Sequence, residues 1–472
     1  MRRKTQNFLP GFFQDDSADD KTLKIVQQYR NIFKAFHEYL TTKCPEIEQL
    51  AHEDLKTLCK PKTSKTSRSR TPDYTTQNLF RAVLVRILCH LTWRGTTIAI
   101  AESNTLQNFC RLSKKETINP YLICLAANHL SPETWRNINT LFGYHMIDAG
   151  KITPETVRVD GTVVETNIHY PTDSSLCWDV YRTIVRIVEK VRELGFDLYL
   201  PDFRFHLKKV KSLNFLINRF AKSKDKKRQR MVKEWYRMII NRTGEAVGKA
   251  QAIVAALLKI GNEVATALAT QLNAFIPWME QIVSVARRRW SGEKVPNEEK
   301  VFSLFERHTE LIIKGKQHKP LEFGHLVWLS QTREKFILFC EACEISPPET
   351  TLLREAIERQ EELYGEKPKN VAADKGIHPG KEEMEDLLEE YEGEVEYLGV
   401  PSRTNDFGDN EMGCAQRFRA GIEGTISFLK RSFGLSRCVF KGFRGFCRFV
   451  GGAVFCHNLL TMVRADLALP DG

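Results

Sequence analysis

Three carboxylates lie in segments where an acidic residue is unexpected. Asp160 interrupts the β-branched run TVRVDGTVVETNIHYP, and Asp374 ends the short strand-like run KNVAAD. An Asp in a strand is locally disfavoured, and burying it without a partner is costly. Glu423 is the only acid between Met412 and Ala465, against nine Lys and Arg. Carboxylates bind hard ions such as Mg²⁺, and two such ions support in-line phosphoryl transfer.

The basic segment around Glu423 has the spacing of a helix. At ~100° per residue, Gln416, Arg419, Glu423 and Lys430 project from one face within about three turns. Glu423 is either a surface acid paired with these cations or a metal ligand beside a bound polyanion. The two strand acids favour the ligand, because three carboxylates from separate segments are the minimum for a paired-metal site.

Two glycines, Gly421 and Gly424, interrupt this helix. Each costs roughly 1 kcal/mol relative to Ala in a helix interior. We expect them to allow close approach by a neighbouring backbone or by nucleic acid.

A second basic segment lies between Arg204 and Arg242, with fourteen Lys and Arg against two acids. The whole chain of 472 residues carries a net charge of +11, so this segment accounts for the excess. The run KSKDKKRQR is either a solvated charge run or a surface that follows phosphates. The density of cations favours phosphate binding, with Lys224, Lys226, Lys227 and Arg228 at its centre.

The N-terminal third reads as helical. We expect a helical region over 1–60, a basic linker over 61–72 that contains PKTSKTSRSRTP, and a second helical module over 73–150. One helix of that module begins at SPETWRNINTLF, where Ser131 is the cap and Pro132 takes the first position. The module is either a helix-turn-helix DNA reader or a plain packing domain, and the pattern does not separate the two.

From residue 151 the sequence pattern predicts alternating strands and helices. The first part of a mixed α/β core covers 151–173, a basic helical insertion covers 174–319, and the remainder of the core covers 320–465. In that remainder we expect two strands in EFGHLVWLSQTREKFILFCEAC, then helix, strand, helix, strand, and the helix of Glu423.

With these segments in order, the sequence resembles a DDE transposase of a bacterial insertion sequence, closest to the ISNCY type. VRVDGTVVETNIHYPTDSS, KPLEFGHLVWL and the ADKG segment carry the resemblance, over about residues 75–460. The related pattern Tyr-x2-Arg-x3-Glu-x6-Lys is matched at Arg419, Glu423 and Lys430, while its Tyr position is Gln416 here.

The resemblance implies a ribonuclease-H-like core with the helical insertion after its first strand. It implies that Asp160, Asp374 and Glu423 bind two Mg²⁺ ions, with Mn²⁺ as a substitute. Arg419 and Lys430 would contact the backbone of the transposon end. The partners implied are double-stranded DNA, as terminal inverted repeats and target, and further copies of the chain in a dimer or larger synaptic complex.

The expected function is therefore metal-dependent cleavage at transposon ends and strand transfer into target DNA. The alternatives are a ribonuclease-H-like nuclease or resolvase without strand transfer, and a catalytically silent DNA-binding protein. Twelve scattered cysteines, no recognisable signal peptide and no apolar run near ~20 residues favour a cytoplasmic protein without a membrane span. The pair Cys340 and Cys343 reads as core thiols, because no second pair follows for a zinc site.

Several aromatic and histidine side chains near these segments are explained by structural roles. Trp178, Trp235 and Trp290 fit a helical core better than a surface that stacks a base. His169 fits a structural role better than a second layer of the site, and His378 follows Asp374 closely enough to touch a scissile phosphate.

Overall fold

The structure is a computed structural model and forms two compact units. The sheet unit combines Met1–Thr166 with His325–Gly472, and the helical unit is Asn167–Gly324. The basic linker expected at 61–72 lies outside the described residues. The structure describes residues 23–59, 74–113, 116–196, 204–313, 320–402 and 410–469.

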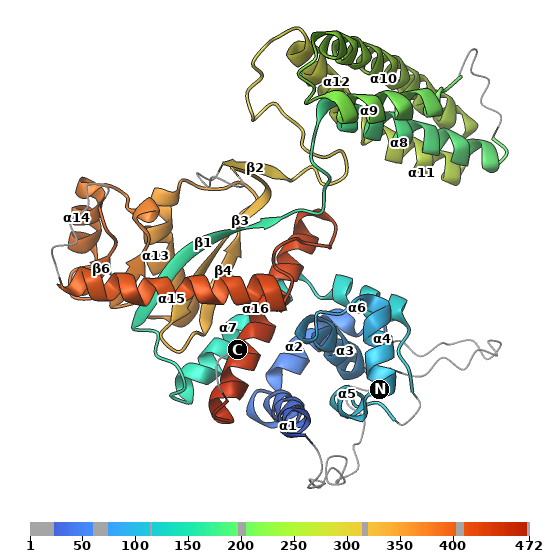
Figure 1. The fold of residues 1–472 in the computed structure, drawn as a ribbon. Coiled ribbons are helices and arrows are strands. Elements are labelled where there is room, and N and C mark those ends of the chain that lie inside the picture. Colours follow the sequence, from blue (N-terminus) through green and yellow to red (C-terminus); the bar gives the residue numbers. More distant parts are fainter. Residues whose placement is uncertain are drawn as a thin grey trace. The chain divides into compact units, whose positions relative to one another are not determined.

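The described strands form one mixed sheet of six strands in the order β2-β3-β1-β5-β6, with β4 paired to β3 (Figure 1). The predicted mixed α/β class is confirmed. Each strand expected from the sequence is present, and one further strand, β2, falls inside the range expected to be helical. The strands are β1 (Thr156–Glu165), β2 (Glu310–Ile313), β3 (Leu321–Thr332), β4 (Ile337–Ala342), β5 (Asn370–Ala373) and β6 (Tyr397–Gly399).

The strand β2 corrects the sequence reading of the insertion, which placed helix as far as residue 319. The last helix before it ends at Trp290, and the run ELII then pairs antiparallel with the first residues of β3, Glu310 opposite Gly324. A four-residue apolar run is too short for periodicity to separate strand from helix, and its pairing partner decides.

The strands that carry the two Asp residues are parallel neighbours. β1 pairs with β5 from Thr156 opposite Asn370 to Val159 opposite Ala373, and β5 pairs in parallel with β6. Parallel strands end at the same edge of a sheet, so residues that follow β5 and β6 lie at one edge together.

Helices of the sheet unit come from both ends of the chain. Ser131 caps α7 as predicted, because its Oγ accepts a hydrogen bond from the Thr134 N–H at 3.0 Å. These helices are α1 (Lys24–Glu38), α2 (Glu46–Leu55), α3 (Thr76–Leu88), α4 (Trp93–Glu102), α5 (Asn104–Phe109), α6 (Pro120–His129), α7 (Pro132–Asp148), α13 (Leu352–Tyr364), α14 (Lys381–Glu390), α15 (Asn410–Ser432) and α16 (Gly442–Asp466).

The N-terminal helices on both sides of the expected linker share one core. Arg81 on α3 is fully buried and its Nε donates to the Glu48 carboxylate on α2 at 2.6 Å. A buried ion pair persists only when its geometry and further hydrogen bonds offset desolvation. Arg81 also donates to the Phe109 carbonyl at 2.8 Å. The helices of 23–59 and 74–148 are thus joined, although the sequence suggested two regions.

The helix α16 is long and apolar enough to cross a membrane, yet 67% of its most apolar stretch is buried inside the protein. Asn458 on this helix accepts from the Ile337 N–H and donates to the Ile337 carbonyl, each at 2.8 Å. The helices α3 and α4 would be long and apolar enough to cross a membrane only if they formed one span, and the chain bends by 106° between them. Core helices can be equally long and apolar, and the packing of α16 against β4 is that of a core helix.

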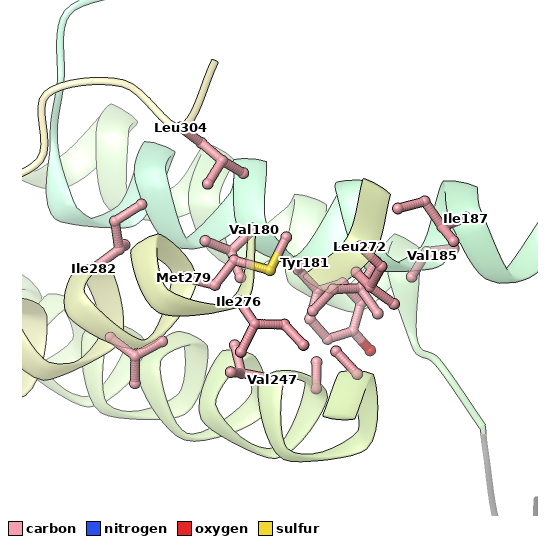
Figure 2. Packing of buried hydrophobic residues seen from close by; sticks show 14 of the residues in the cluster. Val180, Tyr181, Val185, Ile187, Val247, Leu272, Ile276, Met279, Ile282 and Leu304 are labelled. Atoms are coloured by element: carbon pink, nitrogen blue, oxygen red, sulfur yellow. The ribbon is translucent and has the colours of Figure 1, made fainter. Parts of the chain in front are cut away.

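The helical unit is a bundle around its own apolar core. Figure 2 shows Val180 and Tyr181 of the first helix meeting Ile276 and Met279 of the last. Its longest helix, α10, begins after Asp225, whose carboxylate accepts from the Lys227 N–H at 2.9 Å. The helices are α8 (Asp173–Glu193), α9 (Leu207–Phe220), α10 (Lys226–Ile260), α11 (Glu263–Asn273) and α12 (Ile276–Trp290).

Candidate catalytic site on two parallel strands

The structure brings Asp160 and Asp374 to matching positions on neighbouring strands. Val159 lies opposite Ala373 at the last paired position of β1 and β5, and each Asp is the next residue. Neighbouring strands lie about 4.8 Å apart, so the two backbones are adjacent at this point. Asp374 is exposed, while Asp160 is half-buried and its Oδ1 accepts from the Gly161 N–H at 2.7 Å.

The face of β1 that carries Asp160 is the face covered by α15. Alternate residues of a strand share a face, so Arg158 and Asp160 point the same way. Arg158 is buried, and its Nη1 donates to the Phe418 carbonyl of α15 at 2.9 Å. Its Nε donates to Gln331 Oε1 on β3 at 2.8 Å. Burial lowers the pKa of Arg158, and its two hydrogen bonds fix α15 over β1.

Two further side chains fasten α15 along the sheet. Gln416 Nε2 donates to the Ala373 carbonyl at 3.0 Å and to the Gly399 carbonyl at 2.9 Å, at the ends of β5 and β6. Gln331 Nε2 donates to Thr425 Oγ1 at 2.9 Å, further along the helix. The helix therefore crosses the strands, as Figure 1 shows. Gln416, which stands at the Tyr position of the resembled pattern, ties the helix to the strand end that leads into Asp374.

The two glycines of α15 differ in their surroundings. A Cβ at Gly421 would collide with the Arg158 guanidinium, whereas a Cβ at Gly424 would meet nothing within 4 Å. At Gly421 the close approach is made by a buried side chain, rather than by backbone or nucleic acid as expected. Gly424 faces open space, where the expected approach of nucleic acid stays a prediction.

Glu423 lies on the outer side of α15, with 63% of its side chain exposed. Arg419 Nη1 donates to Glu423 Oε1 at 2.9 Å, and the Arg419 side chain is 17% exposed. Ile422 and Leu429 point into the core. Lys430 is half-buried on the same helix. The predicted grouping of Arg419 and Glu423 on one face is present in the structure.

The three acids are not gathered into one cluster. Among the described residues, no three His, Cys, Asp or Glu side chains are grouped so as to hold a metal ion. The donor set suits Mg²⁺, because all three acids offer carboxylate oxygens and two of them are exposed. The sharing of metal ions by Asp160, Asp374 and Glu423 therefore stays a prediction.

The cations of the helical unit are exposed. Lys224, Lys226, Lys227 and Arg228 lie at the start of α10, and the first turn contains no acid. The N-terminus of a helix carries partial positive charge, so cations there are unfavourable without an anion nearby. The Arg228 guanidinium approaches the Asp225 carboxylate at 3.7 Å, which is a weak surface pair. The Asp225 carboxylate is thus the one acid described at this end of the helix, and phosphate binding by the four cations stays a prediction.

The tryptophans and His169 of the helical unit have structural partners. Trp178 and Trp235 pack against the apolar core, and Trp290 Nε1 donates to the Lys233 carbonyl at 3.0 Å. His169 Nε2 lies 2.7 Å from the Asp179 carboxylate, a contact that raises the pKa of His169. These contacts agree with the structural roles expected for Trp178, Trp235 and His169, whereas Trp290 is 38% exposed and lies outside the apolar core.

Two smaller expectations meet the structure in the sheet unit. His378 Nδ1 accepts from the Gly380 N–H at 3.1 Å, so that nitrogen shapes the turn after Asp374. Cys340 lies in β4, and burial raises the pKa of its thiol to about 12. Cys340 and Cys343 are both half-buried, so the prediction that they are core thiols is met only in part.

Arg158, Gln331 and Thr425 position the site, and sequence reasoning did not single them out. The one available signal was Arg158 itself, a cation within a β-branched strand two residues before Asp160. Its partners on β3 and α15 are distant in sequence, so no local sequence pattern predicts these contacts.

No family model matches the chain, and no curated protein or solved structure matches it.

Proposed function

We propose that the chain is a metal-dependent DNA transposase that cuts at the ends of its element and joins them to target DNA. One observation carries the proposal. Asp160 and Asp374 follow the last paired residues of two adjacent parallel strands, and the helix with Glu423 is fastened across those same strands. The resemblance read from the sequence assigned the same three acids to the metal site.

The architecture supports the finer assignment to a ribonuclease-H-like core. A mixed sheet joins an antiparallel pair, β3 and β4, to the parallel strands β1, β5 and β6. The helical unit of 167–324 enters the chain after β1, where the sequence placed an insertion at 174–319. An insertion at this point leaves the pairing of β1 with β5, and so the neighbouring backbones of Asp160 and Asp374, undisturbed.

In this proposal the acids would hold two Mg²⁺ ions. When bound, Mg²⁺ supplies Lewis acidity to phosphoryl oxygens and lowers the pKa of water. Glu423 must leave Arg419 to join the two Asp residues. An exposed i,i+4 pair contributes only about 0.3–0.5 kcal/mol, so that movement is easy. Arg419, once released, and Lys430 are then available to DNA phosphates on the same helix face.

The test is nicking and joining of a labelled transposon-end duplex by the full chain with Mg²⁺ or Mn²⁺. Asp160→Asn, Asp374→Asn and Glu423→Gln should each abolish cleavage and leave DNA binding largely intact. Asp386→Asn, an exposed acid on α14, is the matched control and should cleave normally. Full cleavage by any of the three variants would remove that acid from the site.

The joining step separates the proposal from its nearest rival. Cleavage followed by joining of the 3′ end to a second duplex is the outcome expected of a transposase. Cleavage without joining would instead make the chain a hydrolytic nuclease with the same acids, and binding without cleavage would make it a silent DNA-binding protein.

A further inference from the structure

A cavity of about 310 Å³ lies within the sheet unit, away from the three acids. It is formed by α3, the turn into α4, and the segment that links α15 to α16. Its volume is at the lower end of the range for small-molecule sites and suits one small ligand. Its lining includes Arg86, His90, Trp93, Arg437, Phe440 and Arg448.

The lining is cationic without a balancing acid. Three Arg and one His line it, and none of its described lining residues is Asp or Glu. Arg437 pairs with the Glu165 carboxylate at 3.1 Å, outside the cavity. Arg86 and Arg448 have no such described partner, and their Nε atoms are buried without a hydrogen-bond acceptor.

Two half-buried Arg side chains whose Nε atoms are buried without an acceptor are the feature that calls for a ligand. Burying a charge away from water is costly unless an opposite charge or acceptors compensate. Burial lowers the pKa of Arg86 to about 10, so the guanidinium still carries its charge at neutral pH. Burial, and then the neighbouring Arg444, lower the pKa of Arg448, while Glu133 and Asp54 act against that shift. An anion that entered here would supply the missing acceptors.

Aromatic rings give the cavity a second chemistry. The Arg86 guanidinium lies 4.0 Å from the centre of the Trp93 ring and 5.5 Å from that of Phe440. Phe440 and Phe449 lie 5.9 Å apart between ring centres. Aromatic side chains next to Arg are the platforms on which nucleic-acid bases stack, with the cations holding phosphate.

The rim of the cavity is held in an uncommon backbone conformation. His90 has a φ of 48°, and Gly434 has a φ of 74°. The His90 ring lies against Gly434 so closely that a Cβ on the glycine would collide with it. A non-Gly residue with positive φ is uncommon and persists when the surroundings enforce it. His90 and Gly434 thus fit closely together in the wall of the cavity.

We propose that this cavity binds a single nucleotide unit, with its phosphate on Arg86 and Arg448 and its base against Trp93 and Phe440. The nucleotide is either free or part of a DNA strand, and the ligand chemistry is the same. The proposal stands on the cavity alone and does not depend on the three acids being catalytic.

The experiment titrates the full chain with deoxyadenosine 5′-monophosphate, deoxyadenosine and inorganic phosphate by calorimetry. The monophosphate should bind at least tenfold more tightly than either fragment. Arg86→Met and Arg448→Met should each weaken that binding at least tenfold. Arg444→Met is the matched control, because Arg444 lies on α16 near Arg448 but pairs with Glu133 outside the cavity, and it should change binding less than twofold.

Folding is checked by thermal melting of each variant. Arg86→Met breaks no ion pair but loses the contact with the Trp93 ring, so the variant should fold with a modestly lowered melting temperature. If that variant did not fold, Arg448→Met would carry the test alone. Trp93→Leu separates the two chemistries, since it should weaken the monophosphate and leave inorganic phosphate unchanged.

Competition distinguishes the two sources of the nucleotide. A DNA duplex with a short single-stranded end that displaces the monophosphate, where a blunt duplex does not, identifies a strand end as the ligand. Failure of both duplexes to compete identifies a free nucleotide. Unchanged monophosphate binding in both folded Arg variants, or deoxyadenosine binding as tightly as its monophosphate, would overturn the proposal.

Discussion

The two compact units use their cations in opposite ways. The sheet unit buries several of them among polar and aromatic groups, as at Arg81 and Arg158, which are 0% and 4% exposed. The helical unit is built on an apolar core and carries its cations outside, as at Lys226 and Lys227. At these positions the sheet unit uses Arg to hold its own elements in place, and the helical unit leaves Lys facing solvent.

The difference concerns both energy and precision. A buried guanidinium with fixed hydrogen bonds has one geometry, and removing it leaves acceptors without partners. An exposed Lys contributes a field that any nearby anion feels and that salt screens. We infer that the sheet unit fixes positions, as a catalytic site needs, whereas the helical unit attracts a polyanion without fixing it.

The largest effect on folding is expected from Arg158→Met. The substitution leaves the Phe418 carbonyl and Gln331 Oε1 without their donor, and we expect a loss of about 3 kcal/mol in the free energy of unfolding. Urea unfolding measures it, and hydrogen exchange should show α15 opening first. Arg237→Met is the control, since Arg237 is exposed and pairs only with Glu234 of its own helix, so its urea midpoint should not move. Equal shifts of the urea midpoint in the two variants would contradict the difference that we infer between the units.

Acid should separate the units next. Burial lowers the pKa of His457 on α16 to about 4, so the folded sheet unit keeps it neutral while the unfolded chain protonates it below about 6.5. The free energy of unfolding therefore keeps its full value above pH 6.5. It falls by about 3 kcal/mol as the pH drops toward 4. Residue-level hydrogen exchange at pH 7.5 and 5 measures this change.

His169 in the helical unit has the opposite sign. Its contact with Asp179 raises its pKa, so protonation favours the folded state, and that gain is lost as the pH rises through the folded pKa. The helical unit should thus hold its protection at pH 5 while the sheet unit loses it. His37 on α1 acts in the same direction, because burial and the neighbouring Arg81 lower its pKa to about 3. His457→Gln should therefore remove only part of the acid sensitivity of the sheet unit, and the double variant with His37→Gln should remove more. An equal loss in both units, unchanged by these variants, would contradict this account.

The glycines of α15 offer a smaller, internally matched comparison. Gly421→Ala forces the Arg158 guanidinium to move and should destabilise the protein by about 1–3 kcal/mol. Gly424→Ala meets open space and should stabilise it by about 0.5–1 kcal/mol, because Ala favours the helix. Chemical denaturation of the two variants gives the sign directly. If the free energy of unfolding changed in the same direction in both variants, Arg158 would not pack tightly against Gly421.

The smallest effect on folding is expected where the effect on DNA is broad. Changing Lys224, Lys226, Lys227 and Arg228 together to Glu should leave the melting temperature nearly unchanged. It should weaken binding to every DNA sequence and flatten the plot of log affinity against log salt by roughly 0.9 for each phosphate that the variant no longer neutralises. Lys259→Glu, at the other end of α10, is the control. A loss confined to one DNA sequence would make these residues base readers instead.

Sequence reasoning succeeded where the signal was local. The β-branched run around Asp160 and the run before Asp374 predicted the strands that carry them, and the spacing around Glu423 predicted its helix. It failed where partners are distant along the chain. The contact of Arg158 with Phe418 joins residues 260 positions apart, and the pair of Arg81 with Glu48 spans the expected linker.

The side-chain details of the site were hidden for the same reason. Nothing in the sequence around Gln416 shows that it donates to two strand ends, because those carbonyls belong to other segments. Nor does the helical pattern tell whether a carboxylate turns to its own Arg or to a strand acid. Such choices depend on free-energy differences of about a kcal/mol or less between nearby rotamers and pairs.

The interrupted course of the sheet unit along the chain affects how the protein is made. On a ribosome that adds about 5–20 residues per second, β1 emerges roughly 10 to 40 s before β5, its parallel neighbour. The whole of the helical unit is synthesised within that interval, and it contains its own apolar core. The earlier helices, meanwhile, wait for α16, which supplies much of the surface they pack against. The nascent protein is thus most open to chaperones and proteases in its first third, until the last helix is translated.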